Sequence, residues 1–267
     1  MSVDPKDRFK FGENWSAFLA GLGESNIIEA QRSVSEMLET DSLSGLSFLD
    51  IGSGSGMFSL AAYKLGATVH SFDYDVQSVE CTAELRRRYG SDDRWIVEQA
   101  SVLDGKYMNS LGKFDIVYSW GVLHHTGFMW EAIDNTIDRV KEKGICFIAI
   151  YNDQGVRSKR WKKIKKTYCS GLAGRLLVKT IFIPWFFFRT ILNEVVKGRN
   201  PFTVFKRYRK NRGMSVYHDW IDWLGGYPFE VATPAAVFDY FRKKGFTLVR
   251  LKTTLGLGCN EFVFRKI

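Results

Sequence analysis

Three glycines alternate with two serines at residues 52–56, directly after a short apolar run that contains an acid. The run is Phe48-Leu-Asp-Ile51, so Asp50 stands two residues ahead of the first glycine. Glycines let the backbone take positive φ and approach a ligand closely. A helix that starts behind them offers free N–H groups. Because a glycine-rich turn between a strand and a helix is typical of nucleotide sites, these residues predict a site for a nucleotide-containing ligand.

A second acid follows at the distance that such a site needs. Residues 67–75 form a β-rich run that ends in Asp73-Tyr-Asp75. An acid about 20 residues after the glycines suits a ribose diol, because a carboxylate accepts hydrogen bonds from both hydroxyls. One strand–helix–strand unit separates Asp50 from Asp73. We therefore expect Asp73 to bind the ribose, with Asp75 as the second candidate.

The elements that must position these residues alternate along the chain. The patterns predict helices at 24–40, 58–65, 76–88, 129–140 and 234–244, and strands at 47–51, 69–72, 95–100, 114–119, 144–151, 246–251 and 260–265. This alternation indicates an α/β fold with a parallel sheet covered by helices on both faces. The loop at 256–258 is so short that it permits only a hairpin, which makes the last strand antiparallel.

Two sequence phrases resemble those of a known family. The spacing Gly-x-Gly-x-Gly differs from the dinucleotide fingerprint Gly-x-Gly-x-x-Gly and resembles motif I of class I S-adenosylmethionine (SAM) methyltransferases. The phrase from Phe114 to His125, FDIVYSWGVLHH, resembles motif IV of small-molecule methyltransferases, including those of ubiquinone biosynthesis. The resemblance covers residues 44–151 and 234–267. It implies a Rossmann-like, seven-stranded, mostly parallel sheet. The alternation of strands and helices stops for about 80 residues after the fifth strand, which indicates a helical insertion there.

The resemblance also implies the cofactor and its ligands. SAM would be bound and S-adenosylhomocysteine released, with the ribose at Asp73, adenine beside Ser101 and Val102, and the methionine end near Trp120. The cofactor-binding residues expected in this way are Asp50, Gly52, Ser53, Gly54, Gly56, Asp73, Tyr74, Ser101, Val102, Ser119, Trp120 and Gly121.

Three histidines are candidates for a general base. His124 and His125 follow the fourth strand, at the edge where ligands bind in open α/β sheets, and we take His124 as the first choice. His218 lies in the aromatic segment 217–230. An imidazole titrates near neutral pH and can take a proton from a substrate hydroxyl. We expect no metal site, because the four cysteines are scattered and no two of them form Cys-x-x-Cys.

Other polar and aromatic residues are expected to contact the acceptor. Tyr151 and Asn152 follow the fifth strand, and Trp15 precedes the first helix, where it would belong to a lid. The remaining candidates are Asp219, Trp220 and Asp222 in segment 217–230, and Asn260 and Glu261 at the start of the last strand. Convergent polar groups among aromatic side chains are typical of a substrate pocket.

Positive charge is concentrated in one segment. Residues 153–216 hold 17 Lys or Arg and two acids, a net charge of +15, whereas the whole chain carries +9. We therefore divide the chain into an N-terminal helical lid (1–43), a SAM-binding core (44–152 and 233–267) and a basic, aromatic, helical insertion (153–232). The apolar run at 181–188 is shorter than a membrane span. Three roles remain open for the insertion: a cap on the site, a cap that also contacts an anionic membrane surface through 157–212, or a nucleic-acid surface.

The sequence thus predicts a SAM-dependent methyltransferase that acts on a small molecule, for example on a hydroxyl of a quinol-like, lipid-linked or glycan metabolite. The alternatives are an RNA methyltransferase that uses the basic insertion and a noncatalytic SAM-binding scaffold. No Asn-Pro-Pro-Tyr or Asp-Pro-Pro-Tyr tetrad follows the fourth strand, which disfavours N-methylation of bases. The charged N-terminus lacks an apolar signal core, so we expect a cytoplasmic protein, peripheral at the inner membrane surface if the insertion contacts lipid.

Overall fold

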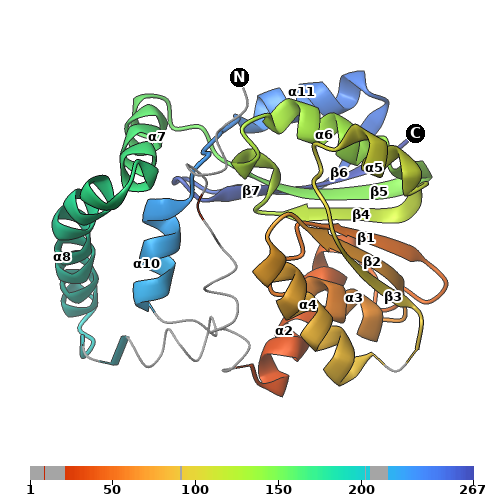
Figure 1. The fold of residues 1–267 in the computed structure, drawn as a ribbon, viewed down its shortest axis with the longest axis horizontal. Coiled ribbons are helices and arrows are strands. Elements are labelled where there is room, and N and C mark those ends of the chain that lie inside the picture. The colour runs from red at the N-terminus through yellow and green to blue at the C-terminus, as the bar shows by residue number, and fades with distance from the viewer. Residues whose placement is uncertain (1–8, 10–21, 91, 202, 205–215) are drawn as a thin grey trace.

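A seven-stranded sheet forms the centre of the molecule (Figure 1). The computed structural model describes residues 9, 22–90, 92–201, 203–204 and 216–267. The strands are β1 (Ser47–Ile51), β2 (Thr68–Asp73), β3 (Trp95–Gln99), β4 (Phe114–Trp120), β5 (Val140–Tyr151), β6 (Phe246–Lys252) and β7 (Cys259–Lys266). Their order across the sheet is β3-β2-β1-β4-β5-β7-β6.

The strand pairing confirms the predicted fold class. β1 pairs in parallel with both β2 and β4, and β4 pairs in parallel with β5. β7 lies between β5 and β6 and is antiparallel to both. Because parallel strands share a direction, the carboxyl ends of β1, β2 and β4 meet at one edge of the sheet, which is where open α/β sheets bind ligands.

Helices cover both faces of the sheet. The α-helices are α2 (Glu24–Leu38), α3 (Met57–Lys64), α4 (Val76–Tyr89), α5 (Gly105–Ser110), α6 (Met129–Ile137), α7 (Val156–Cys169), α8 (Leu172–Val196), α10 (Val216–Gly225) and α11 (Pro234–Lys243), and a 3₁₀ turn, η2, spans Leu123–His125. Figure 1 shows α2, α3 and α4 on one face and α5, α6 and α11 on the other. Alternate residues of β1 point to opposite faces of the sheet. Phe48 therefore packs in the core that contains residues of α3, and Leu49 packs in the core that contains residues of α6.

Three elements differ clearly from the sequence prediction. Helix α5 was not expected, because its six residues show no apolar period. Strand β5 begins at Val140, four residues earlier than expected, and α6 ends at Ile137. The first residues of β5, 141–144, lack the apolar pattern of a strand, so its start could not be seen in the sequence. The strand is also irregular there: its pairing with β4 shifts register, and Lys143 has a φ of +63°.

The insertion leaves and rejoins the sheet at one point. Asn152 forms an isolated parallel bridge with Ala232. The Asp153 N–H donates to the Ala232 carbonyl at 3.1 Å, and the Ala232 N–H donates to the Tyr151 carbonyl at 3.0 Å. Between these points, α7, α8 and α10 stand together at one end of the sheet, on the left in Figure 1. They share an aromatic core that contains Trp161, Phe186 and Phe229.

Candidate active site

A cavity of about 1430 Å³ lies between the carboxyl edge of the sheet and helices α8 and α10. Its sheet side is formed by the ends of β1, β2 and β4 and the loops behind them. Its other side is formed by side chains of the insertion. Pockets for one small ligand measure about 300–1,000 Å³. The cavity therefore has room for two ligands side by side.

The turn after β1 requires its glycines. Gly52, Gly54 and Gly56 have φ values of +77°, +55° and +78°, which side chains disfavour. Space is also short, because a Cβ on Gly52 would lie 2.5 Å from the Val122 side chain and one on Gly56 would lie 2.8 Å from the Thr82 backbone. The turn thus brings its backbone close to both the cavity and its neighbours. Gly52, Ser53 and Gly54 line the cavity.

Asp73 fixes this turn from the next strand. Its carboxylate accepts hydrogen bonds from the backbone N–H groups of Gly54 and Asp75, both at 2.9 Å. Burial raises the pKa of Asp73 to about 6, although these hydrogen bonds oppose the shift. Asp73 also lines the cavity, and a carboxylate has about four lone-pair sites, so it can accept a further hydrogen bond from a ligand there. The geometry suits the ribose role predicted for this residue.

Asp50 is the second carboxyl group of the wall. It is 2% exposed and accepts a hydrogen bond from the Ser59 hydroxyl. The Ser59 hydroxyl also contacts that of Ser71 at 2.7 Å, and the Trp95 indole N–H donates to Ser71 at 2.8 Å. Burial raises the pKa of Asp50 to about 7, and the nearby Asp73 charge adds to the shift. Two buried acids on one wall favour a cation beside them.

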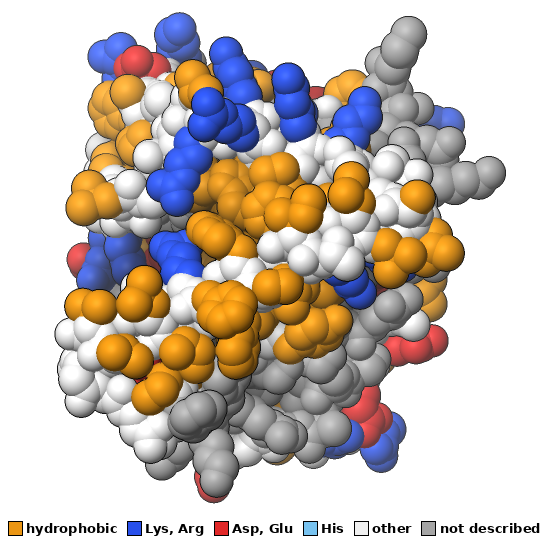
Figure 2. All heavy atoms as spheres, turned by 90° about the vertical axis from the view of Figure 1, so that its left-hand side faces the viewer, with side chains coloured by type: hydrophobic (Ala, Val, Ile, Leu, Met, Phe, Trp, Pro, Cys, Tyr) orange, Lys and Arg blue, Asp and Glu red, His pale blue; other side chains and the backbone are white. Residues whose placement is uncertain are grey.

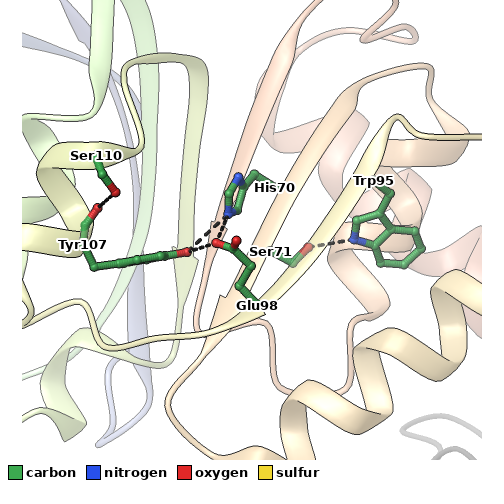
Figure 3. Close-up of polar contacts among 6 residues, drawn as sticks. All are labelled: His70, Ser71, Trp95, Glu98, Tyr107 and Ser110. Atoms are coloured by element: carbon green, nitrogen blue, oxygen red, sulfur yellow. Dashed lines mark hydrogen bonds and ion pairs between the residues drawn. The ribbon is translucent and has the colours of Figure 1, made fainter.

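A separate network holds the loop that follows β3. Figure 3 shows Tyr107 of α5 pointing to Glu98 of β3 and His70 of β2. The Tyr107 hydroxyl donates to Glu98 at 2.6 Å, and the His70 ring nitrogen Nε2 lies 2.9 Å from the same carboxylate oxygen. The network anchors α5, and with it the preceding residues 99–103, which line the cavity and include Ser101 and Val102.

The end of β4 supplies an aromatic side chain. Trp120 is 43% exposed and lines the cavity together with Gly121. Its indole N–H contacts the Glu261 carboxylate at 3.4 Å. Ser119 points the other way, and its hydroxyl donates to the Ile51 carbonyl at 3.0 Å. Ser119 thus ties β4 to β1 rather than lining the cavity.

The histidines differ in their access to the cavity. His125 lines the cavity, and its ring nitrogen Nδ1 lies 2.6 Å from the Pro228 carbonyl. His124 is fully buried, outside the cavity wall, and packs against Tyr151 with ring centroids 4.1 Å apart. The cavity geometry therefore favours His125 as the candidate base over His124, the first choice from the sequence. His218 lies in α10, but its side chain is outside the described residues.

The insertion contributes two helical faces to the cavity. Helix α10 contributes Asp219, Trp220, Asp222 and Trp223, of which the first three were predicted. Helix α8 contributes Phe186, Arg189, Thr190 and Asn193, which were not. Their spacing of three, four and seven residues from Phe186 defines one face of a helix, and this was the signal that could have found them. Tyr151, at the end of β5, completes the boundary between sheet and insertion.

Several predicted residues lie beside the cavity rather than in its wall. Gly56 packs on Thr82. The Asn152 amide donates to the carbonyls of Thr254 and Gly256, and the Asn260 carbonyl accepts from Thr254 N–H. Glu261 reaches the cavity only through Trp120. Ser53, Tyr74, Ser101, Val102 and Gly121 are in the wall, whereas Trp15 lies outside the described residues. Among the described residues, no group of three or more His, Cys, Asp or Glu side chains could hold a metal ion.

Comparisons with known proteins agree with this architecture. The sequence profile of the methyltransferase domain family matches residues 25–199. Curated relatives include ribosomal protein L11 methyltransferases of Bacillus cereus (strain Q1) and Bacillus anthracis (strain CDC 684 / NRRL 3495). Each is 32% identical over an alignment of 118 residues, and the match covers 39% of this chain and 38% of the relative. The match thus spans about two fifths of the length of these relatives.

Two solved structures show the same fold. Magnesium protoporphyrin IX methyltransferase from Synechocystis PCC 6803, solved with bound SAM, has a TM-score of 0.53 and 12% identity over 90% of this chain and 79% of its own. An O-methyltransferase family protein from Burkholderia thailandensis has a TM-score of 0.50 and 12% identity over 88% of this chain and 57% of its own. With the profile matching more than half of its residues, the chain belongs to the methyltransferase domain family and has the class I fold.

Proposed function

We propose that the protein is a SAM-dependent methyltransferase that transfers a methyl group to a hydroxyl of a small molecule. The observation that carries the proposal is the position of Asp73. Its carboxylate holds the Gly54 N–H at the carboxyl edge of the sheet and keeps acceptor sites for a ligand. The family match supports the reaction class. The match to L11 methyltransferases covers only 39% of this chain, so it does not indicate the acceptor.

The residues in the wall suit a SAM molecule. Asp73 would accept hydrogen bonds from the ribose hydroxyls, and the loop with Ser101 and Val102 would contact adenine. The buried carboxyls of Asp50 and Asp73 would favour a cationic ligand. When bound, SAM supplies an electrophilic methyl group on a positively charged sulfur atom.

The rest of the cavity would hold the acceptor. Trp120, Trp220 and Tyr151 provide aromatic walls, and Asp219 and Asp222 provide acceptors for hydroxyl groups. Because the sulfonium is already reactive, positioning supplies much of the rate. The candidate acceptors are a quinol-like, a lipid-linked or a glycan metabolite. A cavity between the sheet and two helices of the insertion favours such a molecule over an RNA strand.

His125 would take the proton of the acceptor hydroxyl. The Pro228 carbonyl can only accept a hydrogen bond, which assigns the proton of the neutral ring to Nδ1 and a lone pair to Nε2. Burial lowers the pKa of His125 to about 3, so the ring is neutral at neutral pH. The hydroxyl proton would pass to Nε2 as the oxygen–carbon bond forms and the carbon–sulfur bond breaks, because the hydroxyl becomes acidic only then.

Calorimetry with SAM tests the proposal. We expect micromolar binding, and we expect Asp73→Asn to weaken it about tenfold or more through lost charge-assisted hydrogen bonds. Asp115→Asn is the matched control, because the Asp115 carboxylate also accepts a hydrogen bond from a backbone N–H, that of Ser47, but lies away from the cavity wall. Absence of SAM binding, or equal affinity in Asp73→Asn and wild type, would contradict the proposal.

A further inference from the structure

The outward face of α8 carries a continuous apolar stripe. Leu177, Ile181, Phe188, Leu192 and Val195 are 56%, 56%, 68%, 61% and 55% exposed. Their spacing of four, seven, four and three residues places them on one side of a helix. The charged side chains of α8 lie off this stripe in the helical repeat. Figure 2, which faces this side of the molecule, shows hydrophobic side chains across the middle of the face.

The opposite face of α8 already has its partners. Val178 and Phe186 are buried. Phe182 packs on Trp161 of α7 with ring centroids 5.5 Å apart, and Phe186 stacks on Trp220 of α10 at 5.7 Å. Helix α8 is therefore held in place by the insertion, and its stripe plays no part in that packing. A helix face in water normally carries polar side chains, so the stripe requires a covering surface.

Exposed cations lie on the neighbouring helix. The exposed Lys and Arg side chains of α7 are Arg157, Lys159, Arg160, Lys162, Lys163 and Lys166. Figure 2 shows Lys and Arg gathered along the upper edge of the face, at the height of α7 in Figure 1. Segment 153–199 contains only two acids, Asp153 and Glu194. The surface that covers the stripe must therefore be apolar at its centre and anionic at its edge.

We propose that the α8 stripe and the α7 cations dock on the surface of an anionic lipid bilayer. Aliphatic and aromatic side chains would enter the boundary between headgroups and acyl chains, while Lys and Arg would contact anionic headgroups. The docking surface is thus defined by the five stripe residues and the six exposed cations of α7.

Helix α8 lies on the bilayer rather than crossing it. By length and composition alone, Leu172–Val196 is long and apolar enough to cross a membrane, unlike the short run at 181–188 that the sequence pattern emphasised. Its inner face, however, packs on α7 and α10 and presents Arg189 and Asn193 to the cavity. A crossing helix would break this packing and take those polar side chains into hydrocarbon.

Two other occupants fit the surface less well. In a symmetric dimer the same patch faces itself, which would bring the α7 cations of the two copies toward each other. An RNA strand would pair with the cations and stack on aromatic rings, but it offers nothing for the aliphatic side chains of Leu177, Ile181 and Leu192. The bilayer alone among the three matches both the charge and the apolar stripe.

Sedimentation with lipid vesicles tests the docking surface. The probes are vesicles of phosphatidylcholine with and without phosphatidylglycerol. We expect wild-type protein to sediment with the anionic vesicles at low salt and to be released as salt screens the charges. Ile181→Gln/Leu192→Gln should reduce vesicle binding at least about fivefold, because two inserted apolar side chains are lost.

Ile28→Gln/Leu255→Gln is the matched control. It removes the same two residue types from positions that are 58% and 100% exposed and lie outside the insertion. Both double variants should keep the wild-type SAM affinity, which shows that they are folded. Wild-type protein that stays in solution with both vesicle types would overturn the proposal. So would equal loss in the two double variants, or a wild-type dimer that only the stripe variant disrupts.

Discussion

At the scale of single residues, the two adjacent histidines show how a short turn selects a functional group. His124 and His125 occupy the same 3₁₀ turn, yet only His125 lines the cavity. The sequence pattern could place both at the end of β4, because that follows from the strand. It could not distinguish them, because their directions depend on contacts with Tyr151 and Pro228, which lie far along the chain.

The proposed role of His125 predicts a specific loss of turnover. His125→Gln should reduce turnover about 10²-fold, the lower end of the usual effect of removing a general base, because a pKa lowered to about 3 makes the ring a weak base. SAM affinity measured by calorimetry should stay unchanged. Because the pKa of His125 is lowered to about 3, its protonation should not reduce the rate between about pH 5 and 8. Turnover at saturating SAM and acceptor is the measurement.

His70→Gln is the control for this experiment. His70 lies in β2 outside the cavity wall, and the hydrogen bond from Tyr107 to Glu98 that anchors α5 does not include it. The variant should keep turnover near the wild-type value. If His125→Gln did the same, histidine base catalysis would be excluded, and positioning or an already ionised acceptor would have to account for the rate.

At the scale of elements, a buried lysine joins α7 to α10. Lys165 is fully buried, donates a hydrogen bond to the Trp223 carbonyl, and lies 4.1 Å from the Trp223 ring centroid and 5.0 Å from that of Phe229. Burial lowers the pKa of Lys165 to about 7, although the Asp222 charge opposes the shift. The contact between the two helices therefore depends on a group that changes charge near neutral pH.

Lys165→Met should change the pH dependence of stability. Between about pH 7 and 10.5 the unfolded chain binds a proton at this lysine that the folded chain has released, so wild-type stability rises with pH there. Lys165 contributes at most about 1.4 kcal/mol per pH unit to the free energy of unfolding. This corresponds to about 2–4 °C in melting temperature per pH unit. Lys165→Met should lack this rise.

Lys163→Met provides the comparison, because Lys163 is exposed on the same helix. Thermal melts of the three proteins between pH 7 and 9 separate the effects. A melting temperature of Lys165→Met that differs from wild type by the same amount at every pH reports only the lost hydrogen bond. A difference that changes with pH reports titration of Lys165. Parallel curves for Lys165→Met and wild type would show that Lys165 does not titrate in this range.

The elements themselves were largely predictable. The seven strands and the helices α2, α3, α4 and α11 follow from apolar periodicity and from glycines that mark turns. Helix α5 was missed because a six-residue helix depends on its cap, the Asp104 carboxylate, rather than on periodicity. The α8 wall of the cavity was missed because helical spacing shows only that Phe186, Arg189, Thr190 and Asn193 share a face. That this face lines the cavity depends on how α8 packs against α7 and α10.

At the scale of the whole molecule, the buried acids of the cavity oppose folding at neutral pH. The pKa values of Asp50 and Asp73 are raised to about 7 and about 6, chiefly by burial. An unfolded carboxyl group releases its proton near pH 4. Between about pH 4 and 7 the folded state therefore binds more protons than the unfolded state, and stability falls as pH rises. The site is thus maintained at the expense of stability.

Asp50→Asn should remove much of that fall. Asparagine keeps an oxygen that accepts from Ser59 and carries no charge, so the gain at pH 7 relative to pH 4 should be on the order of 4 kcal/mol or less. Denaturant unfolding at several pH values measures this gain.

Asp115→Asn is the control. Although burial opposes the shift, hydrogen bonds from Lys141 and Ser47 lower the pKa of Asp115 to about 2, so its stabilising effect is lost only below about pH 4. Equal slopes for Asp50→Asn and wild type would contradict the assignment.

The joint between Asn152 and Ala232 has a consequence for how such proteins diversify. Residues 153–231 begin and end within hydrogen-bond distance of each other, so closing the gap without them would require only a short turn. The whole insertion should therefore be replaceable at this one junction, while the strands and the glycine turn stay intact. A chimaera joined at Asn152 and Ala232 is expected to bind the cofactor as one parent does and the acceptor as the other does.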